Sequence, residues 1–251
     1  MGLNIIAKEK KIKSVWVLGS TSKVAQSICV ELARNGCERF YFLSRNKIKS
    51  KEFSKYLKLK YDVFVEEKFI DLEKVEFLEK QKYFSVSDFD LYLITAGYLG
   101  DNELAKRNYS EAKRIIDVNF TSIIPWINAI TIKERLNKKM ALWIFTSVAA
   151  DRGKPSNYFY GATKSGLKVF SEGLISRCSN KKFSVRVIHA GYMDTPMTSG
   201  KAPRILCINT SKVAKMLLRR PFKRGIEYMP WFWNPIMILI RILPNKIISK
   251  L

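Results

Sequence analysis

The chain has 251 residues, and its 45 Lys and Arg against 22 Asp and Glu give a formal net charge of +23. A chain of this length can bury the core of one α/β domain, and 47% hydrophobic residues exclude a disordered or collagen-like protein. The basic excess predicts an anionic partner, and composition leaves open whether this is nucleic acid, anionic lipid or a phosphorylated substrate. The alternative is that AT-rich coding raises the lysine content without any functional meaning.

Short apolar runs alternate with helical patterns, which is typical of a parallel sheet built from βαβ units. Helices are predicted from residue 24 to about 36, from about 110 to 135 with Pro125 bending or dividing it, and from about 159 to 179. Strands are predicted at residues 15–18, 40–43, 63–65, 91–94, 142–145 and 185–188. Residues 1–225 are therefore expected to form an α/β domain, a Rossmann-like, doubly wound parallel sheet flanked by helices.

The end of the chain differs from this pattern, and we assign residues 226–251 to a basic, apolar C-terminal appendage. Residues 211–225 predict a basic helix and loop, and aromatic residues 231–233 precede an apolar run at 236–243. That run is far shorter than the roughly 20 residues that span a bilayer. Its aromatic and basic flanks favour a segment on an anionic membrane surface. The alternative is a helix packed over the substrate cleft or against a second subunit, which leaves homo-oligomers open.

Metal-binding and disulfide-rich classes are excluded by the scattered positions of the four cysteines and the one histidine: Cys29, Cys37, Cys178, Cys207 and His189. We expect no metal, reduced thiols and a buried strand position for His189. Residues 1–6 contain no long apolar region, so no signal peptide is predicted. These features predict a cytoplasmic protein, attached peripherally to the membrane through its appendage.

A turn rich in hydroxyl groups follows the first predicted strand and opens a helix. Backbone N–H groups of such a turn bind a pyrophosphate. One glycine stands where a dinucleotide-binding turn would have three, so an ordinary strand–turn–helix connection is the alternative. The candidate cofactor residues of this turn are Gly19, Ser20, Thr21, Ser22, Lys23 and Val24.

The end of the second predicted strand indicates which dinucleotide binds. An NAD site usually has an acidic residue there for the ribose 2′-hydroxyl, whereas Arg accommodates a 2′-phosphate. The chain has Ser44 and Arg45 at this position and no acid. This favours NADPH over NADH; the alternative is a solvated Arg in a basic loop.

A phenol and an ammonium group lie four residues apart at Tyr160 and Lys164, on one face of a predicted helix. A nearby Lys⁺ is expected to lower the pKa of Tyr160 from about 10, so that the phenol exchanges a proton with a carbonyl oxygen. Ser147, at the end of the preceding strand, could polarise the same carbonyl. The alternative is a pair of helix-surface residues.

Together these motifs resemble the short-chain dehydrogenase/reductase family over nearly the whole chain. The resemblance implies a carbonyl reductase with Asn119, Ser147, Tyr160 and Lys164 as catalytic residues. It implies that Asn119 positions a water in the proton relay and that Lys164 also holds the nicotinamide ribose. Tyr160 is implied at the cofactor as well, together with Asp71, Leu72, Ala96, Gly97, Gly191, Tyr192, Met193 and Thr195. Lys23, Ala25 and Ala190 depart from the family pattern, which has glycines and a proline there.

The turn and the order of the C-terminal elements are similar to one subgroup, the decaprenylphosphoryl 2-keto-pentofuranose reductases; the segment Lys201-Ala202-Pro203 belongs to this likeness. The resemblance implies a keto-sugar on a polyprenyl phosphate, a separate flavin oxidase as partner and a role in cell-envelope polysaccharide synthesis. The alternatives are reduction of a lipid or other small ketone, and a catalytically silent nucleotide-binding scaffold. No nucleic-acid-binding motif is found, so nucleic acid is not expected as a partner.

Overall fold

The computed structural model describes residues 11–74, 88–136, 138–178, 182–198 and 204–249. Three features named above lie outside these ranges. They are residues 1–6, the segment Lys201-Ala202-Pro203, and residue 179 at the expected end of the third helix.

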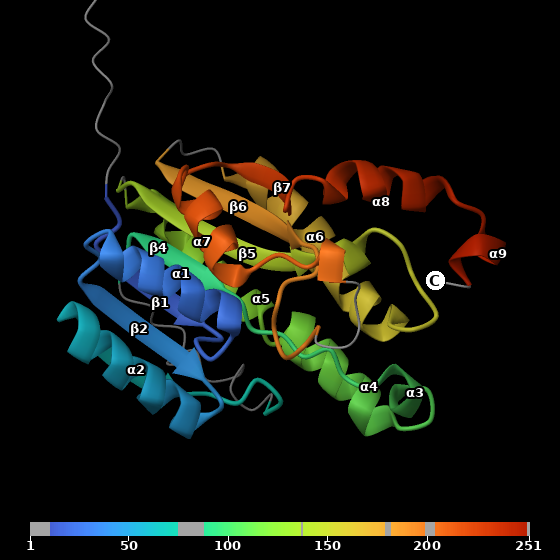
Figure 1. The fold of residues 1–251 in the computed structure, drawn as a ribbon, viewed down its shortest axis with the longest axis horizontal. Coiled ribbons are helices and arrows are strands. Elements are labelled where there is room, and N and C mark those ends of the chain that lie inside the picture. The colour runs from blue at the N-terminus through green and yellow to red at the C-terminus, as the bar shows by residue number, and fades with distance from the viewer. Residues whose placement is uncertain (1–10, 75–87, 137, 179–181, 199–203, 250–251) are drawn as a thin grey trace, which may run out of the picture.

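Within the described ranges, the strands form one parallel sheet in the order β3-β2-β1-β4-β5-β6-β7 (Figure 1). The chain enters the sheet near its centre at β1 and adds β2 and β3 on one side. It then returns to the other side of β1 with β4. The carboxyl ends of β1 and β4 therefore form a topological switch point, where α/β sheets bind ligands. The predicted doubly wound sheet is confirmed. Its strands are β1 Ser14–Leu18, β2 Arg39–Ser44, β3 Phe64–Phe69, β4 Leu91–Ile94, β5 Met140–Ser147, β6 Phe183–Ala190 and β7 Gly225–Met229.

Helices cover both faces of the sheet, which explains why its central strands are apolar throughout. Val15 and Val17 of β1 pack with α1 (Lys23–Arg34), α2 (Lys47–Tyr61) and α7 (Thr210–Leu218) on one face. Trp16 and Leu18 pack on the other face with α5 (Ile124–Thr131) and α6 (Tyr158–Arg177).

The helical region predicted at residues 110–135 is divided in the structure. It contains α4 (Tyr109–Ile116), a π-helical turn (Asp117–Thr121), α5 and a 3-10 turn (Ile132–Arg135), with the short α3 (Asn102–Ala105) before it. Pro125 lies in the first turn of α5, where its missing N–H removes no helical hydrogen bond. Pro125 therefore begins a new helix instead of kinking a long one.

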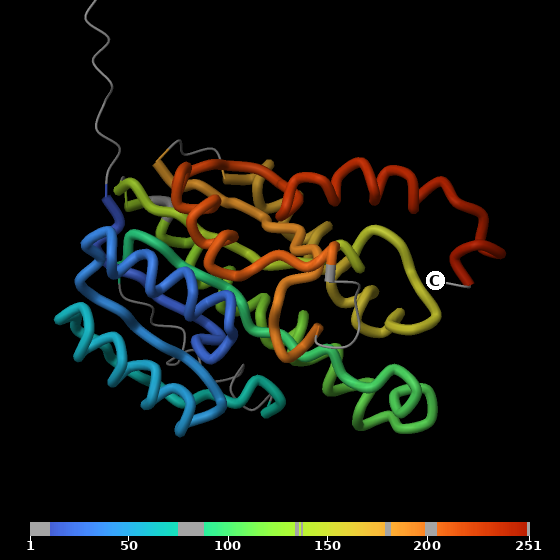
Figure 2. Tube along the Cα trace, in the orientation of Figure 1, coloured from blue at the N-terminus to red at the C-terminus, as the bar shows by residue number. Residues whose placement is uncertain are grey.

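The strand β7 was not predicted, and its residues overlap the proposed boundary at residue 225. It pairs with β6 from Arg186 opposite Gly225 to Ala190 opposite Met229. This edge strand has one charged residue, Glu227, whose carboxylate forms ion pairs with buried Arg186 and with Lys223. The chain continues into α8 (Trp233–Ile242) and α9 (Asn245–Ile248), drawn in red in Figure 2. No described helix is both long and apolar enough to cross a bilayer.

Candidate active site

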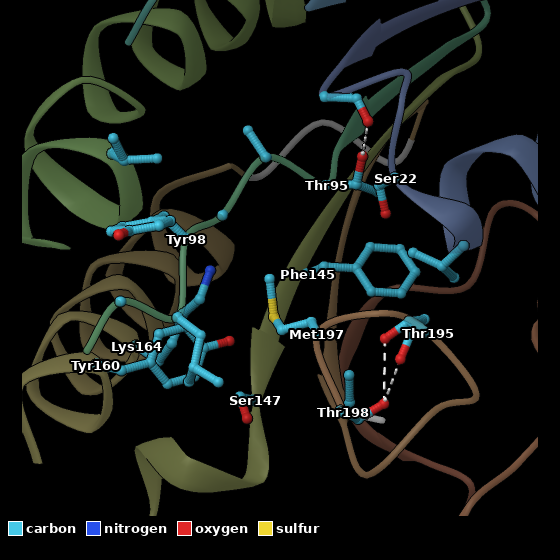
Figure 3. Close-up of a pocket in the computed structure, with 18 of the residues that line it drawn as sticks. Ser22, Thr95, Tyr98, Phe145, Ser147, Tyr160, Lys164, Thr195, Met197 and Thr198 are labelled. Atoms are coloured by element: carbon cyan, nitrogen blue, oxygen red, sulfur yellow. Dashed lines mark hydrogen bonds between the residues drawn. The ribbon is translucent and has the colours of Figure 1, made fainter. Parts of the chain in front are cut away.

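A cavity of about 1100 Å³ lies at the carboxyl ends of the strands, and Figure 3 shows part of its wall. Ser20 and Asn119 are the two predicted site residues that do not line it. The others are brought together on its wall: Gly19, Thr21, Ser22, Lys23, Val24, Ser44, Arg45, Asp71, Leu72, Ala96, Gly97, Ser147, Tyr160, Lys164, Gly191, Tyr192, Met193 and Thr195.

The turn after β1 requires glycine at one position. Gly19 has φ +93°, and a Cβ there would lie 2.5 Å from the backbone nitrogen of Ala96. The hydroxyl of Thr95 donates to the carbonyl oxygens of Leu18 (3.2 Å) and Gly19 (3.1 Å), which fixes the turn against the end of β4. Ser20 is buried, and its hydroxyl forms no hydrogen bond with the described residues. Its expected hydrogen bond to a pyrophosphate stays a prediction.

The end of β2 holds the groups expected for a 2′-phosphate, together with a carboxylate that the sequence did not indicate. The Ser44 hydroxyl is buried at the cavity wall and has no hydrogen-bond partner among the described residues. The guanidinium of Arg45 forms an ion pair with Glu73, whose Oε1 also accepts from Nε of Arg114 at 2.8 Å. An unpartnered hydroxyl beside a guanidinium fits a 2′-phosphorylated dinucleotide. Glu73 would compete with the 2′-phosphate for Arg45.

The catalytic candidates meet at the other end of the cavity. Tyr160 and Lys164 extend from α6 into the same part of the cavity, and Ser147 ends β5 beside them (Figure 3). The ammonium of Lys164 lies 5.6 Å from the centre of the Tyr160 ring. Lys164 is only 3% exposed, so its position is set by packing as well as by the four-residue spacing.

Burial controls the protonation of this pair. It raises the pKa of Tyr160 to about 12, with a hydrogen bond from Ser147 acting in the opposite direction. It lowers the pKa of the Lys164 ammonium to about 8. The predicted lowering of the Tyr160 pKa by Lys164 is therefore not found, because burial disfavours both charged forms. Tyr160 keeps its proton at neutral pH, which is the form that can donate to a carbonyl oxygen.

Asn119 acts through the backbone around the cavity. It lies in the π-helical turn, a feature frequent at functional sites. Its side-chain nitrogen donates to the carbonyl oxygens of Tyr98 (2.6 Å) and Ile115 (2.8 Å), and its oxygen accepts from the Tyr98 N–H at 3.0 Å. Asn119 thus positions the loop after β4 opposite Lys164. The water relay implied by the family resemblance stays a prediction.

The loop after β6 lines the cavity and contacts the start of α1. Nζ of Lys23 lies 3.1 Å from Oδ2 of Asp194, which joins the start of α1 to this loop. The hydroxyl of Thr198 lies 3.1 Å from that of Thr195 (Figure 3). The same hydroxyl donates to the carbonyl oxygen of Met193. Lys23, which replaces a glycine of the family pattern, therefore holds a neighbouring loop in place.

Helix α8 supplies two wall residues that sequence reasoning missed, Trp233 and Met237. The indole packs so closely on Gly191 that a Cβ there would lie 1.9 Å from its Nε1. The rings of Tyr192 and Trp233 meet edge to face at 5.4 Å. The only sequence signal was the aromatic run at 231–233, for which a helix over the cleft was one of the alternatives.

His189 is a buried strand residue, as the sequence predicts. It is 1% exposed, and its Nδ1 forms a hydrogen bond with the hydroxyl of Thr146. Burial lowers its pKa to about 4, so the ring is neutral at physiological pH. His189 is not part of the cavity wall.

Comparisons with known proteins agree with this geometry. A family model described as short chain dehydrogenase matches residues 13–205. An uncharacterised oxidoreductase of Mycobacterium tuberculosis is 26% identical over 154 residues, which cover 61% of this chain and 62% of that protein, less than two thirds of its length. A 3-oxoacyl-(acyl-carrier-protein) reductase of Buchnera aphidicola is 25% identical over 218 residues, or 84% of this chain and 83% of that protein.

Solved structures share the fold. A short-chain dehydrogenase from Sphingobium yanoikuyae in complex with NADPH has a TM-score of 0.76 at 16% identity, covering 93% of this chain and 97% of that one. A ketone-specific alcohol dehydrogenase from Comamonas testosteroni has a TM-score of 0.73 at 16% identity, covering 86% of each chain. At such low identity the likeness concerns the fold alone.

Proposed function

Because the chain belongs to the short-chain dehydrogenase family, we propose that it is an NADPH-dependent reductase of a keto-sugar carried on polyprenyl phosphate. The family makes it an oxidoreductase that depends on a nicotinamide dinucleotide. The phosphorylated coenzyme, the keto-sugar and a role in cell-envelope polysaccharide synthesis are the proposed part.

The observation that carries the reductase assignment is the meeting of Ser147, Tyr160 and Lys164 in the cavity that begins at the Gly19 turn. NADPH, when bound, supplies the hydride that the carbonyl carbon receives. Tyr160 gives its proton to the carbonyl oxygen, and the ketone becomes an alcohol. The Ser147 hydroxyl donates a hydrogen bond to the same oxygen. The Lys164 ammonium stabilises the negative charge that then develops on Tyr160.

The choice of NADPH is supported by the groups at the end of β2. Arg45 offers a planar guanidinium that matches phosphate geometry, and Ser44 offers a buried, unpartnered hydroxyl. An NAD site usually has an acidic residue at this position to hold the free ribose 2′-hydroxyl, whereas this chain has Ser44 and Arg45 there.

The lipid-linked keto-sugar is supported by the subgroup resemblance and by the chemistry of the wall. Lys154 lines the cavity and is partly buried, which lowers its pKa. A cation in the wall suits a phosphate-bearing substrate. Trp233 and Met237 add an apolar side that suits a sugar ring and a lipid chain. A flavin oxidase that oxidises the parent alcohol would supply the ketone.

A second candidate substrate is a lipid ketone such as a 3-oxoacyl thioester. The B. aphidicola relative, by its name, reduces one, and it matches more of this chain than the mycobacterial oxidoreductase does. The apolar part of the wall would accept an acyl chain as well.

Oxidation of NADPH by the purified full chain tests these proposals. The substrates are a polyprenyl-phosphate keto-pentose, a 3-oxoacyl thioester and a simple water-soluble ketone. We expect kcat/KM to be highest for the keto-pentose, by about tenfold or more, because a site built to bind polar groups discriminates against compounds that lack them. A faster thioester would replace the substrate assignment. NADPH binding without oxidation by any of the three would indicate a silent scaffold.

A further inference from the structure

Helix α8 has two unlike faces. Its inner face carries Trp233 and Met237, which are 4% and 2% exposed and line the active-site cavity. Its outer face carries Ile238, Leu239 and Ile242, which are 54%, 57% and 74% exposed. Figures 1 and 2 show α8 leaving the edge strand β7 and running along the margin of the molecule, with α9 beyond it.

Further exposed apolar residues precede and follow α8. Trp231 precedes the helix and is largely exposed, and Ile247 of α9 is about half exposed. Residues 228–251 contain no Asp or Glu, and their bases are Arg241, Lys246 and Lys250. Large exposed apolar residues gathered on one segment of a folded domain indicate an interaction site, and the sequence of this segment is basic.

This surface is held firmly on the domain. The guanidinium of Arg241 donates to the hydroxyl of Tyr228 at 2.6 Å, and that hydroxyl donates to buried Asp151 at 2.6 Å. Arg152 donates to the carbonyl oxygen of Leu243 at 3.2 Å, just after the helix ends. The inner side of α8 is thus fixed by packing and hydrogen bonds, which leaves its outer side facing away from the sheet.

We propose that the outer face of α8, with Trp231 and Ile247, docks on an anionic lipid bilayer. A second copy of this chain would bring another +23 charge towards the same surface, whereas anionic headgroups complement it. Tryptophan beside exposed apolar residues suits the headgroup region, and nearby bases are attracted to an anionic leaflet. The helix lies in the interface and does not span the membrane.

The docking surface places the cavity next to the bilayer, because the same helix forms its wall through Trp233 and Met237. A lipid-linked substrate could then enter without leaving the membrane. Docking on lipid requires only the exposed apolar residues and the basic charge, so it is independent of the reductase activity.

Sedimentation of the full chain with vesicles tests the proposal. One set of vesicles contains equal parts of phosphatidylcholine and phosphatidylglycerol, and the other contains phosphatidylcholine only. We expect binding to the first set, weakened by added salt. The double variant Leu239→Gln/Ile242→Gln keeps good helix formers at exposed positions and should lower the partition coefficient about tenfold or more.

The matched control is Ile48→Gln/Leu59→Gln on α2, at the other edge of the sheet. Ile48 and Leu59 are at least as exposed as the α8 pair, and α2 carries six lysines. We expect this variant to sediment like the wild type, and both variants to bind NADPH with unchanged affinity, because none of the four residues lines the cavity.

Three outcomes would overturn the proposal. In the first, the wild type fails to bind the anionic vesicles or binds both sets equally. In the second, the two double variants lose binding equally. In the third, the wild type is a dimer and only the α8 substitutions make it a monomer, so that a second copy occupies the surface. If the chain reduces a ketone and does not bind vesicles, only the docking surface is refuted. A vesicle-binding chain without reductase activity would refute the proposed function alone.

Discussion

The two ends of the active-site cavity are built in different ways. At the catalytic end, Lys164 and Asn119 are buried, and the pKa values of Tyr160 and Lys164 are displaced by that burial. At the dinucleotide end, Lys23 and Arg45 are about half exposed and held in ion pairs with Asp194 and Glu73. Buried groups cannot relax into solvent, whereas exposed pairs exchange readily with water and ions. Substitutions should therefore have large effects at the first end and graded effects at the second.

The largest effects on activity are expected for substitutions of Tyr160 and Lys164, and the first of these is Tyr160→Phe. The change removes the proton donor and keeps the ring, so kcat should fall by about a thousandfold. The Kd for NADPH, measured by fluorescence titration, should change by less than about tenfold, because one neutral hydrogen bond contributes only about 1 kcal/mol net. Turnover near that of the wild type would refute the assignment of Tyr160.

Lys164→Met should abolish activity and yet stabilise the fold. The pKa of Lys164 is about 8 in the folded chain against 10.5 as its ordinary value. Burying the charged form therefore costs about 3 kcal/mol at pH 7, which the variant avoids. The gain should be complete below pH 8 and shrink as pH rises towards 10.5, because the wild-type folded state releases its proton first. Denaturant unfolding of both proteins across this range gives the difference, and a constant difference would contradict the burial argument.

Gly19→Ala, at the dinucleotide end, is matched by Gly36→Ala, which lies after the C-terminus of α1 and outside the cavity wall. Both glycines have positive φ, +93° and +84°, so both variants carry a backbone cost of about 1–2 kcal/mol. Only at Gly19 does the new Cβ meet backbone, at Ala96, whereas nothing lies within 4 Å of it at Gly36. NADPH affinity should fall about a hundredfold for Gly19→Ala and stay unchanged for Gly36→Ala. Equal affinities would show that the turn has room to shift.

The smallest effects concern the choice of coenzyme. Arg45→Ala should weaken NADPH about tenfold and NADH much less, because only NADPH carries the 2′-phosphate. Glu73→Gln removes the carboxylate that competes for Arg45 and should strengthen NADPH by a few fold, within the range of exposed ion pairs. Isothermal titration with both dinucleotides gives the ratios. A parallel change for NADPH and NADH would remove Arg45 from the 2′-phosphate site.

Much of the fold and of the catalytic end could be predicted from local patterns in the chain. The apolar runs that became β1, β2, β4, β5 and β6 are continuous because helices cover both faces of the sheet. The spacing of Tyr160 and Lys164 is a property of one helix. Gly19 comes immediately after the last residue of β1, so its place in the turn is also a local feature. Such features depend on neighbours in sequence, so a sequence is enough to find them.

Contacts between distant segments decided the rest. Glu73 next to Arg45, Trp233 on Gly191 and Glu227 beside Arg186 join residues 28, 42 and 41 positions apart in the chain. The last contact pairs the one charged residue of the edge strand β7 with a buried arginine of β6. The pKa of Tyr160 likewise follows the burial of its site more than the spacing to Lys164. The sequence by itself determined the sheet and the catalytic residue types, because these are local patterns. Only the tertiary structure decided the protonation of Tyr160, the partner of Arg45 and the wall formed by α8, because desolvation and charge pairing depend on which distant segments pack together.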